Sequence, residues 1–195
     1  MITRRHLMAT AAATLSVGAF PALGQDALIP DYKMPQDMLP QKVLVGDALA
    51  PGVVHVNPDE FALYWTLSDG WAMRYAVGIG RVGLYEPGIF TVGARKEWPG
   101  WTPTPSMIKR SPEHYAKYAG GMPGGINNPL GSRALYLFTP ERGDTFLRIH
   151  GTNAPETIGK AVSNGCARLV NDQMIDLYNR VPRNTKVILY DKLND

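Results

Sequence analysis

The feature that most constrains the fold is a series of short runs of β-branched and aromatic residues, each bounded by a turn. Residues 53–56 and 61–65 are two such runs, and the Asn-Pro-Asp-Glu segment between them is typical of a turn. Similar runs occupy residues 71–79, 133–138, 145–150 and 186–190. The sequence therefore predicts a mostly β fold with two or three short helices.

Two segments carry helix signals. Ser111 at an N-cap position, Pro112 at the first helical position and Gly120 at the end predict a short helix. Because Gly-rich loops flank this helix, it is a candidate lid over a binding site. A second helix is expected over residues 172–180, where apolar positions share one face and Asn171 is in place to cap the first turn.

Residues 1–24 have the composition of an export signal. Arg4 and Arg5 precede an uncharged, Ala-rich apolar run over residues 9–20, and small residues follow at the positions that a signal peptidase reads. The paired arginines resemble a twin-arginine signal, and the alternative is an ordinary secretory signal. The run is shorter than the ~20 residues that a membrane-spanning helix needs, so no stable membrane insertion is expected.

The rest of the chain suggests one domain of moderate size. Residues 25–50 contain three prolines and no clear periodicity, which indicates a linker or N-terminal arm. An apolar content of 45% is sufficient for a core over residues 51–191. Removal of residues 1–24 lowers the formal net charge from +3 to +1, so nothing in the charge favours nucleic acid as a partner.

The residues best suited to catalysis are His150 and Cys166, which is the only cysteine in the chain. A lone cysteine in an exported protein cannot form an internal disulfide, and it is either a buried, inert side chain or a functional thiol. Thiol catalysis needs a base to take the proton and N–H donors to hold an oxyanion. An imidazole at the end of a strand and a Gly-containing turn around Cys166 supply both, which favours a catalytic Cys–His pair.

The sequence contains no motif for a nucleotide cofactor or a metal site. Gly78 and Gly80 form a Gly-x-Gly pattern, but the spacing of a dinucleotide site is missing. His55 lies in a predicted strand, without a second His, Cys or carboxylate at metal-ligand spacing. We therefore expect neither a metal nor a cofactor.

The residues around the pair resemble a known family. His150-Gly151-Thr152, a spacer, and then Ser163-Asn164-Gly165-Cys166-Ala167-Arg168-Leu169 are similar to the signature of the bacterial L,D-transpeptidases with the YkuD-type fold. The resemblance covers roughly residues 50–191. Asn164 and Ala167 depart from the family's commonest choices. Histidine precedes cysteine, as in this family and unlike papain-like enzymes.

The resemblance implies a YkuD-like β-sandwich and a cysteine acyl-enzyme mechanism in the periplasm. Cys166 would attack the carbonyl between diaminopimelate and D-alanine in a peptidoglycan tetrapeptide stem, and His150 would act as the base. The Gly151 carbonyl would orient the imidazole, and N–H groups around Asn164, Gly165 and Cys166 would hold the oxyanion. An amine from a second stem would then form the cross-link. The resemblance also implies acylation by carbapenems.

Four further residues have two interpretations each. Arg168 either meets a substrate carboxylate or braces nearby carbonyls, and Ser163 either supports the catalytic turn and the histidine or caps a local turn. Trp98 and Trp101 either line a groove for a glycopeptide or cover the sheet.

The acyl acceptor also remains open. Water would make the protein an L,D-carboxypeptidase or hydrolase, and the amine of an outer-membrane protein would make it an anchoring enzyme. A wall-binding module without activity is the non-enzymatic alternative, against which the intact Cys166, His150, Gly165 and Arg168 argue.

Overall fold

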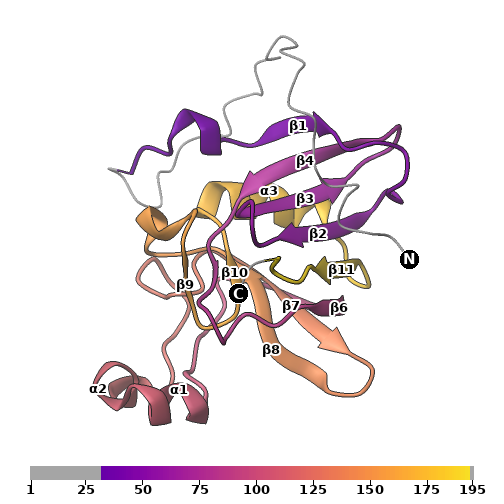
Figure 1. Cartoon of the computed structure of the whole chain (residues 1–195). Coiled ribbons are helices and arrows are strands. Elements are labelled where there is room, and N and C mark those ends of the chain that lie inside the picture. Colours follow the sequence, from indigo (N-terminus) through magenta and orange to yellow (C-terminus); the bar gives the residue numbers. More distant parts are fainter. Residues whose placement is uncertain (1–31, 194–195) are drawn as a thin grey trace.

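The computed structural model describes residues 32–193 (Figure 1). The predicted export signal, residues 1–24, lies outside the described residues. Most of the secondary structure is β. The main-sheet strands are β1 (Gln41–Leu44), β2 (Val53–Asn57), β3 (Ala62–Thr66), β4 (Trp71–Ala76), β6 (Gly88–Glu97), β7 (Arg133–Thr139), β8 (Gly143–His150), β10 (Ala167–Arg168) and β11 (Lys186–Leu189). A small second sheet contains β5 (Ile79–Gly80) and β9 (Ala161–Ser163).

The helices are short. They are α1 (Pro105–Arg110), α2 (Pro112–Tyr115) and α3 (Asn171–Arg180), with 3-10 turns η2 (Gln36–Met38), η3 (Ala116–Tyr118) and η4 (Pro155–Thr157). This composition confirms the prediction of a mostly β fold with short helices. Within residues 32–193, no helix is long and apolar enough to cross a membrane.

The main sheet has two halves, antiparallel except for β10, that are joined by the last strand. Its order is β1-β4-β3-β2-β11-β6-β7-β8-β10. Strand β11 runs parallel to β2 and antiparallel to β6, so it connects the two halves by hydrogen bonds (Figure 1). Strand β10 pairs in parallel with β8 at the far edge. The C-terminal strand β11 therefore attaches the half of the sheet that contains β8 and β10 to the other half.

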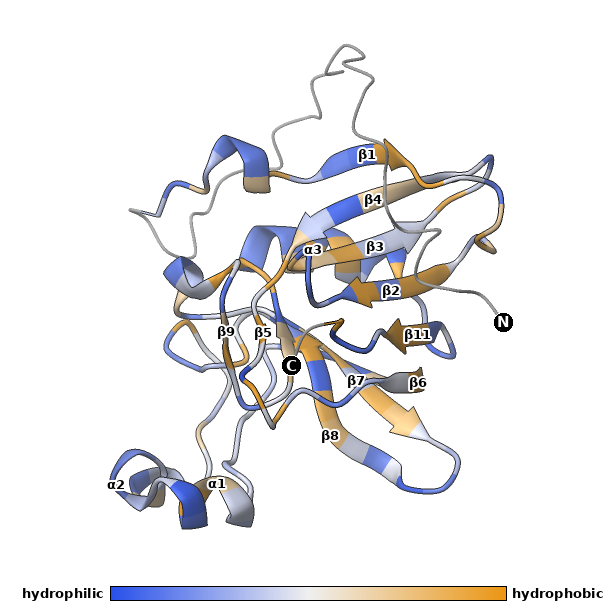
Figure 2. Ribbon diagram, viewed as in Figure 1, coloured by the Kyte–Doolittle hydropathy of each residue, from blue (hydrophilic) through white to orange (hydrophobic). Residues whose placement is uncertain are grey.

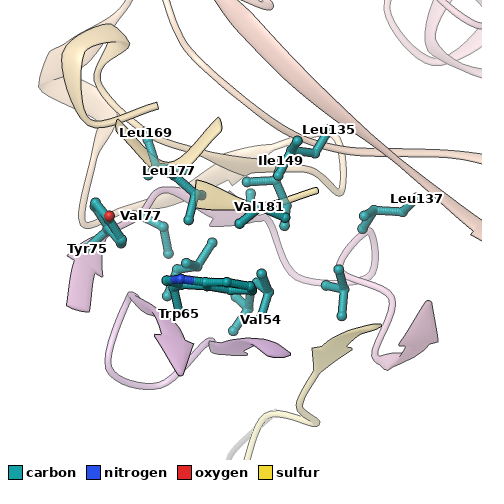
Figure 3. Packing of buried hydrophobic residues seen from close by; sticks show 14 of the residues in the cluster. Val54, Trp65, Tyr75, Val77, Leu135, Leu137, Ile149, Leu169, Leu177 and Val181 are labelled. Carbon is teal, nitrogen blue, oxygen red and sulfur yellow. The ribbon is translucent and has the colours of Figure 1, made fainter. Parts of the chain in front are cut away.

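One core cluster is shared by both halves and by α3. Trp65 and Val54 from the first half and Leu135 and Ile149 from the second belong to it (Figure 3). Helix α3 contributes the fully buried Leu177. Since burial of an apolar side chain contributes about 1.5–3 kcal/mol, this cluster is the main source of stability.

Two of the expected elements differ in detail. The run over residues 71–79 is divided between β4 and β5, because the chain leaves the main sheet after Ala76 and pairs with β9. The helix expected over residues 111–120 is α2 followed by η3, and α1 precedes it without having been predicted. The ten-residue strand β6 was also missed.

Part of the predicted linker or arm is structured. Strand β1, within residues 25–50, adds to the edge of the main sheet by antiparallel pairing with β4. The Gln173 amide of α3 donates to the Met38 carbonyl at 3.2 Å. These contacts fix the end of the arm against the rest of the domain.

Helices α1 and α2 form a lobe that projects from the sheet (Figures 1 and 2). Neither helix contains a buried residue. The Thr104 side chain accepts from the Met107 N–H, which caps α1. Because the lobe adds nothing to the core, its position depends on contacts with the neighbouring segments outside the core.

A bulge interrupts the pairing of β7 and β8. Tyr136 pairs with Arg148 and Phe138 with Asp144, so one residue of β7 lies opposite three of β8. Phe146, in the middle of the three, has φ 61° and a side chain that is 67% exposed. A bulky residue in the left-handed backbone conformation is unusual. This conformation persists only where neighbouring contacts hold it.

Hydrogen bonds on both sides maintain the bulge. The Thr145 hydroxyl donates to the Leu137 carbonyl at 2.7 Å, and the Phe146 N–H donates to the Asp144 carboxylate at 2.9 Å. Arg148 in turn binds both Asp144 carboxylate oxygens. Bulges of this kind are common next to active sites, where they direct a group toward the site.

This conformation yields a stability prediction. At position 146 a glycine variant should be more stable than an alanine variant by about 1 kcal/mol, because only glycine adopts this φ without steric cost. Chemical denaturation of Phe146→Gly and Phe146→Ala measures the difference. A more stable alanine variant would show that residue 146 does not have the left-handed conformation.

Candidate active site

The predicted histidine and cysteine are brought together by strand pairing. His150 is the last residue of β8, and Cys166 immediately precedes β10. In the parallel pairing of these strands, Ala167 lies opposite Ile149 and Arg168 opposite His150. The residues between the two strands therefore fold back, and Cys166 is placed beside the end of the strand that carries His150.

The imidazole is buried and has a fixed orientation. His150 is 4% exposed, and its Nδ1 lies 2.5 Å from the Gly151 carbonyl oxygen. Burial lowers the pKa of His150 to about 3, an effect that the Gly151 carbonyl opposes and that Arg168 and Arg148 reinforce. The ring is thus neutral at neutral pH. Nδ1 carries the hydrogen that is donated to Gly151, so Nε2 is left as a proton acceptor.

The thiol is protonated in this state. Burial raises the pKa of Cys166, although a backbone hydrogen bond at Arg148 and the charges of Arg148 and Arg168 lower it in part. The Sγ atom makes a long contact of 4.0 Å with the Phe146 carbonyl oxygen. A neutral thiol beside a neutral imidazole can become a nucleophile only when the proton is transferred to a base.

The turn before Cys166 is held by Ser163. The Ser163 hydroxyl donates to the Cys166 carbonyl at 2.7 Å and accepts from the Gly165 N–H at 3.2 Å. The Gly165 N–H is therefore occupied in this state. Within the described residues, the N–H groups of Asn164 and Cys166 make no such bond, so they remain free to donate to an oxyanion.

Glycines allow close approach of the segments around this turn. Gly165 has φ 121°, and a Cβ there would lie 2.9 Å from the Leu84 carbonyl oxygen. A Cβ at Gly80 would lie 2.9 Å from the Gly165 Cα. Gly78 exchanges backbone hydrogen bonds with Arg168 at 2.8 and 2.9 Å. The Gly-x-Gly pattern thus allows β5 to pack closely against residues 163–166, the turn that carries Cys166 (the catalytic turn).

Asn164 connects the catalytic turn to the lobe. Its Oδ1 accepts from Arg110 at 2.7 Å and from Arg81 at 3.4 Å. Its Nδ2 donates to the Tyr115 hydroxyl at 2.9 Å. Since Arg110 ends α1 and Tyr115 ends α2, Asn164 ties the lobe to the turn before Cys166.

Arg168, two residues after Cys166, is partly buried. Its Nε and Nη2 atoms are buried and have no hydrogen-bond partner among residues 32–193. Burial lowers the pKa of Arg168, while Cys166, Glu156 and Tyr115 act in the opposite direction. An arginine with unused donors two residues from Cys166 is available to an anion.

The two predicted tryptophans have different positions. Trp101 packs edge-on against Tyr115 and Tyr118, and it lines a pocket of about 440 Å³ that also includes Asn153. Trp98 does not line that pocket. It is 39% exposed and has φ 42°.

Sequence reasoning missed the role of Asn171. It does not cap α3, whose N-cap is Val170. Instead its Oδ1 accepts from the Ser132 and Thr152 N–H groups at 2.9 and 3.2 Å. A Cβ at Gly151 would lie 2.2 Å from the same oxygen. Asn171 therefore holds the backbone that follows His150, and only a contact between distant segments could reveal this.

Replacement of Asn171 by alanine should be costly. Two buried N–H groups would lose their acceptor, and we expect a loss of about 3 kcal/mol in the free energy of unfolding. Thermal or chemical denaturation measures it. Asn153→Ala is the matched control, because the exposed Asn153 side chain donates only to the Asn127 carbonyl. Equal stability of the two variants would contradict the assigned role.

Comparison with known proteins gives a consistent picture. A family model for the L,D-transpeptidase catalytic domain, YkuD, matches residues 51–189. The probable L,D-transpeptidase ErfK/SrfK of Escherichia coli is 34% identical over 172 residues, which cover 87% of this chain and 53% of that protein. The chain thus spans about half the length of this relative.

Solved structures share the fold. A structure described as a probable carnitine operon oxidoreductase from Brucella melitensis is 43% identical, with a TM-score of 0.54 over 80% of this chain and 94% of that one. An L,D-transpeptidase from Mycobacterium smegmatis has the same fold at 15% identity, with a TM-score of 0.52 over 71% of this chain and 58% of that one.

Proposed function

The chain belongs to the YkuD family of L,D-transpeptidase catalytic domains, and we propose that it is a cysteine acyltransferase that cross-links peptidoglycan. The single observation that supports the proposal most strongly is the pairing of β8 with β10, which places Cys166 beside the strand that ends in His150. The orientation of the imidazole by Gly151 adds the base that a protonated thiol requires.

The first half of the reaction forms a thioester. Nε2 of His150 takes the thiol proton as Sγ of Cys166 attacks the carbonyl carbon between diaminopimelate and D-alanine. The N–H groups of Asn164 and Cys166 hold the oxyanion. When the C–N bond breaks, His150 returns the proton to the leaving amine, and D-alanine departs with an intact amino group.

The second half transfers the acyl group. The amine of a neighbouring stem attacks the thioester carbon, and Nε2 of His150 takes the amine proton. The C–S bond breaks as the new amide forms, and the proton passes to the leaving thiolate. Water, or the amine of an outer-membrane protein, could replace the stem amine in this step without any change in the catalytic residues.

The lobe and the pocket beneath it provide a surface for the acyl donor. Trp101, Tyr115 and Tyr118 offer aromatic faces to a glycopeptide, and the pocket also includes Asn153, close to His150 in sequence. Arg168 and Ser163 are assigned supporting roles, the former by its charge and the latter by its two bonds to the catalytic turn.

Purified disaccharide-tetrapeptide is the substrate that tests this function. Incubation with the protein should release D-alanine and yield a cross-linked dimer, both identified by mass spectrometry. Release of D-alanine without dimer would favour the hydrolase. An unchanged substrate, under conditions where the protein is folded, would argue against catalysis on this stem.

We propose that the enzyme acts in the periplasm after export by the twin-arginine route. Arg4, Arg5 and the apolar run over residues 9–20 support the proposal. A mature protein that begins near residue 25 is expected.

A further inference from the structure

Two arginines converge on one neutral oxygen next to the catalytic turn. Arg81 follows β5 and Arg110 ends α1, and each directs an Nη2 atom to Oδ1 of Asn164. Both arginine side chains are exposed. An amide oxygen satisfies one donor of each guanidinium and neutralises neither charge.

The charges around this point are unbalanced. Neither Arg81 nor Arg110 forms a salt bridge within the described residues, where Arg133, Arg142, Arg148 and Arg180 form those made by arginines. Arg168, with buried and unpartnered donors, lies on the inner side of the same turn. Because like charges at short range repel, an anion between these groups would be stabilised.

A third kind of donor is present. The Tyr115 hydroxyl accepts from Nδ2 of Asn164, so its own hydrogen is free to be donated. Two guanidinium groups and a phenol hydroxyl around one side-chain amide are all donors that a carboxylate can accept from. Asn164 holds all three groups in place.

The position of this cluster restricts which anion it can take. Asn164 precedes Cys166 by two residues, so their Cα atoms are at most about 7 Å apart. A carboxylate bound there belongs to a substrate residue that adjoins the bond under attack. We propose that Arg81, Arg110 and Tyr115, organised by Asn164, form a subsite for a carboxylate of the acyl donor.

This inference rests on the proposed function, which supplies two carboxylates of the required chemistry. One is the terminal carboxylate of the leaving D-alanine, and the other is the side-chain carboxylate of diaminopimelate. Both are acceptors for a guanidinium, and substrates that lack one or the other distinguish them.

The experiment measures D-alanine or D-alaninamide release from three synthetic donors. These are the parent tetrapeptide, its C-terminal amide, and the tetrapeptide with the diaminopimelate side-chain carboxylate converted to an amide. Each is assayed with the wild-type protein, the double variant Arg81→Gln/Arg110→Gln, and the control Arg183→Gln. Glutamine keeps an N–H donor but has no charge, and Arg183 is an exposed arginine that binds the Gly93 carbonyl.

For the wild type and the control, one of the two amidations should lower kcat/KM by about tenfold or more, as expected for loss of a charged hydrogen-bond partner. In the double variant the same amidation should change kcat/KM by less than about twofold, because the two guanidinium charges that would bind the carboxylate have been removed. Arg81→Lys/Arg110→Lys should restore part of the sensitivity.

Equal sensitivity of the wild type and the double variant would overturn the subsite, as would a wild type that is insensitive to both amidations. If the wild type released no amine from any donor, the proposed function itself would have failed. A double variant with normal thermal unfolding but sensitivity like that of the wild type would assign carboxylate recognition to other residues.

Discussion

Replacement of Cys166 by alanine is expected to reduce D-alanine release from a tetrapeptide by about 10⁴-fold or more, because no other group can form the thioester. Cys166 is the only cysteine in the chain, so no second thiol can substitute for it. The measurement is the rate of D-alanine release at saturating substrate, with the variant at high concentration.

The fold of this variant should be intact. The Cys166 side chain is partly buried, and its Sγ atom contributes only a long contact to the Phe146 carbonyl, so we expect the free energy of unfolding to change by less than about 1 kcal/mol. Normal activity in a Cys166→Ala protein would end the assignment of the nucleophile. A large loss of stability would indicate that Cys166 is a packing residue.

Replacement of His150 by glutamine should slow acylation by about 10²–10⁴-fold, the range expected for loss of a general base. A glutamine amide is uncharged and similar in length to the imidazole, but it cannot take the proton of the thiol. Stopped-flow measurement of thioester formation isolates this step from transfer. An unchanged rate would require a different base.

The pH dependence of the wild type provides an independent readout of the same base. Burial lowers the pKa of His150 to about 3, so the imidazole remains a neutral base as the pH falls from 7 to 5. Acylation should therefore show no step near 6.5, the value of an unperturbed histidine. A loss of activity centred there would show that the imidazole is solvated in the working enzyme.

The sequence was sufficient for the features that depend on local patterns. The β-branched runs predicted the positions of β2, β3, β7 and β11, since alternation and turn residues are local signals. The motif around Cys166 and the order of histidine and cysteine indicated the family. Helix α3 was predicted from its apolar face, and its boundaries were correct to one residue.

Other features depend on contacts between distant segments. Strand β6 ends in Ala-Arg-Lys-Glu, and charged residues of this kind are not a strand signal in the sequence. The strand forms because it pairs with β7 and β11. The left-handed conformation of Phe146 arises from the bulge and not from the residue type. The convergence of Arg81 and Arg110 on Asn164 joins positions 54 and 83 residues apart, which no local pattern reports.

The departures from the family pattern gain a physical meaning in the structure. Asn164 presents both an acceptor and a donor, and it uses them to bind two arginines and a tyrosine. A shorter side chain in its place would lack the reach for these three contacts. Ala167 is buried in the core cluster, opposite Ile149 of β8.

The most direct test of the account is to identify the residue that becomes acylated. The protein is incubated with a carbapenem at neutral pH, and intact-protein mass spectrometry is followed by peptide mapping. A strained amide carbonyl placed before Cys166 should give one stable adduct, on the peptide that contains Cys166. The adduct should be absent from Cys166→Ala and slow to form in His150→Gln. An adduct on any other residue, or none on folded protein, would contradict the assignment of Cys166 as the nucleophile.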